Sequence, residues 1–160
     1  MFRIWILALF VVSACSSMGG YREAGLGYSL SGIQSEVADE IPGGLNKVSQ
    51  NRREFVSYYF LPTQFDETYK SKSALFRARA HCYILGDRRP YDLVVRIDIQ
   101  KRPASKKEIE NIQSHKQLSQ GVWGPVQEDK RLAKRIAKRI VDSLKKSHRN
   151  RNLIDDFRAF

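Results

Sequence analysis

The chain has 160 residues, a length that suits one domain with a short additional segment. Its 28 Lys and Arg residues outnumber its 17 Asp and Glu residues, and the formal charge of +11 predicts an anionic partner or surface. The apolar run Ile4 to Val12 is far shorter than the roughly 20 residues that a membrane-spanning helix needs, which argues against an uncleaved anchor.

The first fifteen residues have the parts of a secretory signal peptide. Arg3 supplies a positive charge, an apolar h-region follows, and small residues close it. The closing residues Val12-Ser13-Ala14-Cys15 resemble the lipobox of bacterial lipoproteins, in which an aliphatic residue and two small ones precede the cysteine that becomes the mature N-terminus. The resemblance implies that residues 1–14 are removed and that the Cys15 thiol carries lipid. The alternative is an ordinary signal peptide that happens to contain a cysteine.

The same resemblance implies a location in the bacterial cell envelope. Such lipoproteins carry two or three acyl chains, and at about 0.8 kcal/mol for each buried methylene this makes a permanent anchor. Under the sorting rule of many Gram-negative species, an aspartate after the cysteine retains the protein in the inner membrane. Ser16 stands there, which implies the outer membrane, facing the periplasm. Loss of Arg3 with the signal would change the charge from +11 to +10, and the anions within reach would be those of the envelope rather than nucleic acid.

Glycine is concentrated in the next segment, where residues 16–50 hold seven of the ten glycines. This composition predicts that residues 15–50 form a lipidated, flexible tether. Within it, Ile33 to Ile41 could form either a short helix or a short strand. Residues 51–148 are expected to form the domain, and residues 149–160 a C-terminal tail that could bind a partner or fold back.

Two segments with alternating apolar and polar residues predict an antiparallel hairpin with one buried face. They run from Ala74 to Leu85 and from Tyr91 to Gln100, and Gly86 to Pro90 turns the chain between them. Phe55 to Leu61 is also rich in strand-forming residues, and Pro62 stops it.

Two registers of this hairpin keep the apolar residues on one face. Ile84 opposite Leu93 would place Arg79 beside Asp98, whereas a shift of two residues would place Arg77 there instead. Either register gives the aspartate a cationic neighbour across the strands.

Three residues near the hairpin could carry chemistry, and each also has a simpler interpretation. Cys82 falls on the apolar face and has no partner if Cys15 is lipidated, so we expect a buried structural cysteine rather than a reactive thiol. His81 falls on the polar face with no second histidine nearby, which favours a solvated strand residue over a metal ligand. Trp123 is expected to pack against the sheet, with ligand stacking as the alternative.

The segment from Lys130 to Lys146 predicts an amphipathic helix. Its apolar residues recur at the spacing of one helix face: they are Leu132, Ala133, Ile136, Ala137, Ile140, Val141 and Leu144. The opposite side carries six cations that form a candidate anion-binding face: Lys130, Arg131, Lys134, Arg135, Lys138 and Arg139.

Three interpretations of this helix compete. It could cover the sheet with a merely solvated basic face, present the same face to an anionic partner, or lie on a membrane with its apolar face in lipid. The apolar face of the hairpin needs a cover, which favours the docked helix.

The predicted fold is therefore α+β, with a small antiparallel sheet of about three or more strands covered on one face by a C-terminal amphipathic helix. A lipidated cysteine, an antiparallel sheet and a closing helix are also similar in outline to lipopolysaccharide-assembly lipoproteins and other small envelope lipoproteins. This likeness is architectural and identifies no site residue.

No catalytic residue, metal site or cofactor is predicted, because the histidines are scattered and no nucleophile elbow, metal-ligand cluster or phosphate-binding glycine loop is present in the sequence. We expect a non-enzymatic binding or assembly module, anchored to the membrane, whose partner is an acidic envelope protein, lipopolysaccharide or anionic lipid. The alternatives are an unrecognised envelope hydrolase and, if the signal is misread, a basic nucleic-acid-binding protein.

Overall fold

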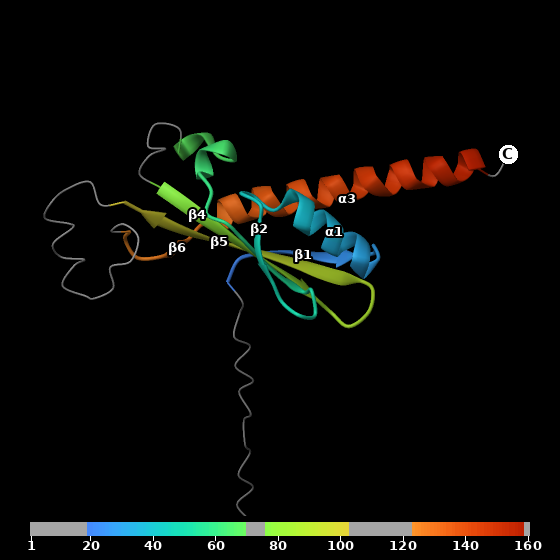
Figure 1. The fold of residues 1–160 in the computed structure, drawn as a ribbon, viewed down its shortest axis with the longest axis horizontal. Coiled ribbons are helices and arrows are strands. Elements are labelled where there is room, and N and C mark those ends of the chain that lie inside the picture. The colour runs from blue at the N-terminus through green and yellow to red at the C-terminus, as the bar shows by residue number, and fades with distance from the viewer. Residues whose placement is uncertain (1–18, 70–75, 103–122, 159–160) are drawn as a thin grey trace, which may run out of the picture.

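The structure is a computed structural model, and it describes residues 19–69, 76–102 and 123–158 (Figure 1). Cys15 and residues 1–14 lie outside the described residues, so lipidation and signal cleavage remain predictions. No helix in the described part of the chain is long and apolar enough to cross a bilayer.

One antiparallel sheet of six strands forms the centre of the fold. The strands follow the order β1-β5-β4-β3-β2, and the short β6 pairs with the same edge of β5 as β1 does. Their bounds are β1 Tyr21–Leu26, β2 Leu45–Val48, β3 Glu54–Ser57, β4 Phe76–Leu85, β5 Tyr91–Lys101 and β6 Gln127–Glu128.

Two helices, α1 (Leu30–Glu40) and α3 (Lys130–Arg158), pack against each other and against one face of this sheet (Figure 1). The other face carries no helix among the described residues. The predicted α+β class, with a C-terminal helix covering one face of an antiparallel sheet, is therefore confirmed.

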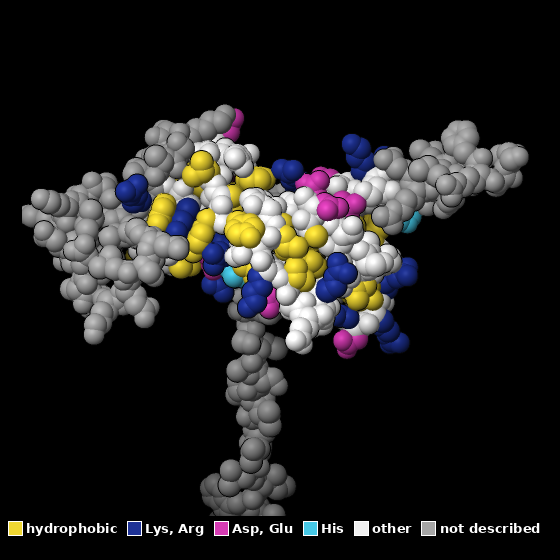
Figure 2. Space-filling view, viewed as in Figure 1, with side chains coloured by type: hydrophobic (Ala, Val, Ile, Leu, Met, Phe, Trp, Pro, Cys, Tyr) yellow, Lys and Arg dark blue, Asp and Glu magenta, His cyan; other side chains and the backbone are white. Residues whose placement is uncertain are grey.

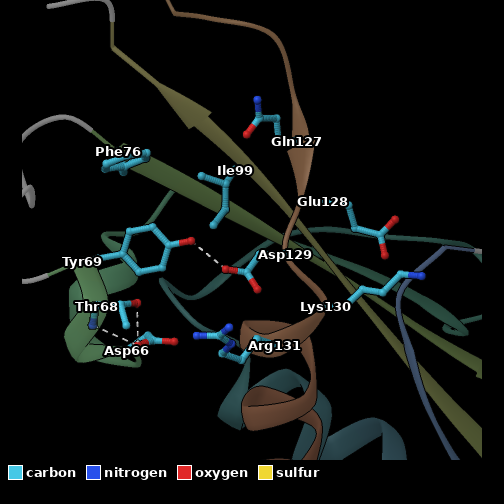
Figure 3. Close-up of a pocket in the computed structure, with 10 residues that line it drawn as sticks. All are labelled: Asp66, Thr68, Tyr69, Phe76, Ile99, Gln127, Glu128, Asp129, Lys130 and Arg131. Carbon is cyan, nitrogen blue, oxygen red and sulfur yellow. Dashed lines mark hydrogen bonds between the residues drawn. The ribbon is translucent and has the colours of Figure 1, made fainter.

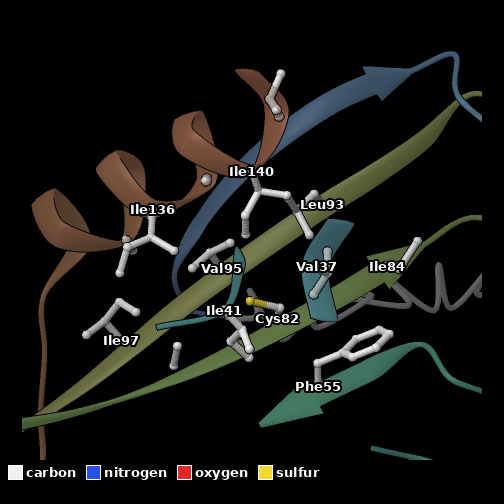
Figure 4. Close-up of a cluster of buried hydrophobic side chains, with 14 of the residues drawn as sticks. Val37, Ile41, Phe55, Cys82, Ile84, Leu93, Val95, Ile97, Ile136 and Ile140 are labelled. Carbon is white, nitrogen blue, oxygen red and sulfur yellow. The ribbon is translucent and has the colours of Figure 1, made fainter. Parts of the chain in front are cut away.

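The hairpin of β4 and β5 is confirmed, and the structure selects one of its two registers. Ile84 lies opposite Leu93 and Arg79 lies opposite Asp98. Gly86 turns the chain with a φ of +101°, in the left-handed region that favours glycine. The apolar alternation reflects burial, since Figure 4 shows Ile84, Leu93 and their neighbours directed into the core.

The prediction of a flexible tether over residues 15–50 is wrong for residues 21–48. β1 pairs with β5, α1 packs on the sheet, and β2 pairs with β3. Glycine is needed at one of these positions because two backbone segments approach closely. Gly20 has a φ of +116°, and an added Cβ would lie 2.6 Å from the Val95 carbonyl oxygen. The glycines were misread as a sign of flexibility because the strand partner of this segment lies far along the chain.

Of the two possibilities for Ile33 to Ile41, the helix is correct. Ser29 caps α1 by accepting a hydrogen bond from the Gly32 amide at 3.1 Å. Ile33 and Val37, one turn apart, are fully buried against the sheet. The helix ends just before Pro42, whose ring disfavours helical geometry in the preceding residue.

The strand predicted over Phe55 to Leu61 is shorter than expected. The hydroxyl of Ser57 accepts a hydrogen bond from the Ala80 amide at 2.8 Å, and β3 ends at that residue. The chain meets β4 again only at a bridge between Phe60 and Ala78, before the short 3-10 helix η1 (Pro62–Gln64). This break leaves Tyr59 41% exposed at the sheet surface.

The predicted helix is α3, and its apolar stripe is buried throughout, as Figure 4 shows for Ile136 and Ile140. Asp129 caps its first turn, since its carboxylate accepts a hydrogen bond from the Leu132 amide at 2.9 Å. This packing contradicts the interpretation in which the stripe lies in lipid. The backbone stays helical through Arg158, so the predicted C-terminal tail begins as a continuation of α3.

Candidate functional site

The six cations of the predicted anion-binding face of α3 form three groups: two arginines paired with acidic residues, three lysines, and Arg131, which lines a pocket described below. Lys130, Arg131, Lys134, Arg135, Lys138 and Arg139 are all exposed. Two of them are already paired: Arg139 Nε lies 2.7 Å from Glu40 Oε2, and an Arg135 guanidinium nitrogen lies 3.5 Å from Asp66 Oδ1. These pairs tie α3 to α1 and to the turn after η1, so both arginines have a structural role.

Three lysines on the same helix remain available, and we call Lys130, Lys134 and Lys138 the lysine row. They follow one another at intervals of four residues and therefore lie along one side of α3. None forms an ion pair with another described residue. Lys134 Nζ lies 5.8 Å from the centre of the Tyr21 ring, which places the row beside the first residue of β1.

The described chain begins at the same place. Gly19 packs so closely on Glu128, two residues before α3, that an added Cβ would lie 2.5 Å from Glu128 Oε2. The N-terminal end of the domain and the beginning of the lysine row are therefore neighbours.

A pocket of about 470 Å³ opens beside the first turn of α3 (Figure 3). Its wall includes the buried carboxylate of Asp66, which is 2% exposed. Oδ1 accepts hydrogen bonds from the Thr68 amide and hydroxyl, whereas Oδ2 has no hydrogen-bond partner among the described residues. Burial alone would raise the pKa of Asp66, but the bonds from Thr68 and the charges of Arg135 and Arg131 outweigh it and lower the pKa. Asp66 is thus ionised at neutral pH and cannot act there as a general acid.

The second carboxylate of this pocket also has a structural role. Asp129 caps α3 with one oxygen and accepts a hydrogen bond from the Tyr69 hydroxyl with the other, at 2.6 Å. Burial and this hydrogen bond raise the pKa of Tyr69 well above its ordinary value. The hydrogen bond between Tyr69 and Asp129 therefore connects the segment after η1 to the beginning of α3.

A stack of aromatic rings and guanidinium groups lies on the sheet face opposite the helices. The Arg77 guanidinium lies 3.9 Å from the centre of the Tyr59 ring and 4.2 Å from that of Trp123. Arg79 lies 4.0 Å from the same Tyr59 ring. Figure 2 shows dark blue and yellow side chains alternating in a row on this part of the surface. We call Trp123, Arg77, Tyr59 and Arg79 the guanidinium stack.

Cross-strand pairing leaves Arg79 without a carboxylate. Asp98 lies opposite it in the ladder, but the Asp98 carboxylate binds Arg96 Nε at 2.9 Å and lies 3.5 Å from His81 Nε2. Arg79 thus lies across from Asp98 as one register predicted, but the ion pair of Asp98 is formed with Arg96 of its own strand.

The predictions for Cys82, His81 and Trp123 agree with the structure to different extents. Cys82 is fully buried, and burial raises its pKa to about 12, as expected of a structural cysteine. His81 is half-buried rather than solvated, and burial lowers its pKa although Asp98 opposes the change. No group of metal-binding side chains occurs among the described residues. Trp123 packs on the sheet through Arg77.

Sequence reasoning missed the guanidinium stack because its members are distant along the chain. The sequence places Arg77 and Arg79 in a strand of the hairpin and Tyr59 in a segment rich in strand-forming residues, and local spacing does not bring the two together. The one available signal was the pair of arginines two residues apart, which places both side chains on the same face.

Comparisons of the chain with protein families, with curated proteins and with solved structures found no match.

Proposed function

We propose that this protein is a lipoprotein of the bacterial cell envelope, anchored through Cys15 in the outer membrane and facing the periplasm, and that it acts as a non-enzymatic binding or assembly module. The observation that carries the proposal is the sequence Val12-Ser13-Ala14-Cys15 at the end of an apolar h-region. It stands only four residues before Gly19, the first described residue.

The short interval between Cys15 and the domain limits how far the domain can lie from the membrane. Four residues span at most about 14 Å when fully extended. Since residues 21–48 belong to the folded domain, as β1, α1 and β2, no long tether separates the domain from the acyl chains. A domain acylated at Cys15 would therefore rest on the bilayer with the beginning of β1 towards the head groups.

This placement brings the lysine row close to the membrane surface. Gly19 lies against Glu128, and Lys134 lies over Tyr21, so the row begins at the point where the chain leaves the anchor. Each lysine near an anionic surface contributes about 1 kcal/mol to binding. Of the six predicted cations, the lysine row is thus the part that an anionic head group or acidic partner would engage.

The decisive experiment compares wild-type protein with Cys15→Ala in a Gram-negative host grown with radiolabelled palmitate. The wild-type chain should incorporate label and fractionate with outer membranes, because the Cys15 thiol accepts the lipid. The variant should take up no label and leave the outer-membrane fraction.

A variant that removes the other cysteine, Cys82→Ala, serves as the matched control and should keep both the label and the membrane location. If wild type and Cys15→Ala fractionate alike and neither is labelled, the proposal of a lipoprotein is wrong.

A further inference from the structure

The guanidinium stack is fixed by its own geometry. Two guanidinium groups that both lie within 4.0 Å of one ring centre would collide on the same face, so Arg77 and Arg79 occupy opposite faces of Tyr59. Trp123 covers Arg77 from the other side, which makes a continuous series of ring, cation, ring and cation. Stacking of this kind holds the planar guanidinium in place and leaves its N–H edges free to donate.

The surrounding hydrogen bonds reinforce this arrangement. Arg77 Nε donates to Gln100 Oε1 at 2.9 Å, and the Gln100 amide donates to the Gly124 carbonyl beside Trp123 at 3.3 Å. The loop that carries the tryptophan is thereby connected to the same strand pair as the arginine. The stack is therefore positioned before any ligand arrives.

The stack brings two positive charges together with no negative charge to balance them. No carboxylate among the described residues lies within ion-pairing distance of Arg77 or Arg79, because Asp98 is bound to Arg96. The buried Nε of Arg79 has no acceptor in the described part of the chain, so an external anion would bind the terminal N–H groups of this guanidinium. Two unpaired guanidinium groups held on either side of one aromatic ring indicate a binding site for an external anion.

The form of the stack limits which anion fits. Nucleic-acid-binding surfaces offer free ring faces on which bases stack, but here guanidinium groups cover both faces of Tyr59 and one face of Trp123. What remains for recognition is the second face of Trp123 and the N–H edges of two separate guanidinium forks on either side of Tyr59. Such planar forks match carboxylate or phosphate groups, and their separation favours a ligand that carries more than one such group.

A hollow of about 410 Å³ lies next to Arg77, between Tyr59, Leu61 and Trp123. Tyr59 and Leu61 are among the most exposed large apolar side chains of the described chain. The hollow would take the apolar part of a ligand unit whose carboxylate binds the arginine.

We propose that the guanidinium stack is a binding site for the carboxylate groups of peptidoglycan. The choice of this polymer depends on the envelope location proposed above, whereas the anion site depends only on the geometry of the stack. The polymer carries its carboxylates on short peptides attached at intervals along a neutral sugar chain, which offers separate anions to the two forks and a neutral part to the adjoining hollow.

The test is sedimentation of the purified full-length chain, kept in detergent, with isolated peptidoglycan sacculi. Wild-type protein should bind, and the double variant Arg77→Gln, Arg79→Gln should bind at least tenfold more weakly. The control variant Arg88→Gln, Arg89→Gln removes the same charge from the exposed turn after β4 and should bind as wild type does. Circular dichroism of all variants establishes that each is folded.

A second variant separates the stack from simple charge. Arg77→Lys, Arg79→Lys keeps both charges but loses the planar forks, and it should also bind at least tenfold more weakly. If the lysine variant binds as wild type does, or the turn control loses as much as the glutamine variant, the stack is not the site.

Three further ligands identify the source of the anion. Sacculi with amidated carboxylates should lose binding of the wild-type protein, and neither lipopolysaccharide nor a single-stranded oligonucleotide should compete at matched charge. Unchanged binding to amidated sacculi, or tighter binding to either competitor, would overturn peptidoglycan as the ligand. Because acylation plays no part in this measurement, its failure and a failure of the lipoprotein proposal are distinguishable.

Discussion

At the scale of single residues, the surroundings decide how a buried polar group behaves. Cys82 pairs in register with Val95 and is fully buried, so nothing stabilises its thiolate and its pKa rises to about 12. Asp66 is 2% exposed but lines a pocket, and the hydrogen bonds from Thr68 and the charge of Arg135 keep it ionised. The two groups therefore have pKa values shifted in opposite directions, towards a neutral thiol and a charged carboxylate.

Cys82 should be protected from alkylation in the folded protein. At pH 8, a thiol with a pKa of about 12 is ionised to roughly one part in 10⁴, against roughly a quarter for an exposed cysteine. In the Cys15→Ala variant, where it is the only thiol, iodoacetamide should react with Cys82 at least ~10³-fold more slowly than in 6 M urea. Mass spectrometry over time gives both rates.

The pH dependence provides the check on this explanation. A raised pKa means that the protonated form is the stable one in the folded state, so the native rate should stay low from pH 7 to pH 9 and depend on unfolding. Native alkylation as fast as in urea, with a rate that rises less than tenfold per pH unit above pH 8, would show an accessible thiol of ordinary pKa and contradict the buried position.

At the scale of elements, α3 has two basic sides with different tasks. On the side towards α1, Arg139 pairs with Glu40, and Ser143 donates a hydrogen bond to Glu36 at 2.8 Å. The lysine row has no such partner in the described residues and borders β1. The helix thus uses one set of charges for packing, and the proposed anion site depends on the other.

Removing the lysine row should weaken binding to anionic membranes without loss of stability. At about 1 kcal/mol for each lysine, Lys130→Gln, Lys134→Gln, Lys138→Gln should reduce affinity for vesicles containing phosphatidylglycerol by roughly 100-fold at low salt. Flotation of the Cys15→Ala protein, which lacks the lipid anchor, isolates this electrostatic contribution.

The control removes three positive charges from the opposite end of the described surface of α3, through Lys145→Gln, Lys146→Gln and Arg149→Gln. These residues lie four to six turns from the beginning of the helix, so their loss should lower affinity much less. Equal losses in the two triple variants would mean that net charge, and not the position of the lysine row, controls binding.

The same elements show what the sequence could predict. Alternation in β4 and β5 and the period of α3 were readable because local spacing alone defines their buried faces. The pairing of Arg139 was not readable, since Glu40 lies 99 residues away along the chain. The guanidinium stack was missed for the same reason, because Tyr59 and Trp123 meet Arg77 only through sheet pairing.

At the scale of the whole molecule, the glycine-rich segment completes the sheet instead of forming the predicted tether. β1 lies along β5, and the Asp92 carboxylate of β5 accepts a hydrogen bond from the Gly25 amide at 2.9 Å and pairs with Arg22. The lysine row and the guanidinium stack then lie on opposite sides of this sheet. A lipid anchor close to the first side would leave the second directed away from the bilayer.

This arrangement predicts that residues within the glycine-rich segment carry stability. Leu26 is 5% exposed and belongs to the core, whereas Leu45 of the same segment is 36% exposed. Leu26→Ala should lower the free energy of unfolding by about 2–5 kcal/mol, the range for a buried leucine. Leu45→Ala makes the same chemical change near the surface and should lower it by less than about 1 kcal/mol. Urea denaturation followed by circular dichroism measures both values. A flexible tether contributes nothing to folding, so equal and negligible losses in the two variants would mean that this segment is a tether and that β1 is not part of the domain.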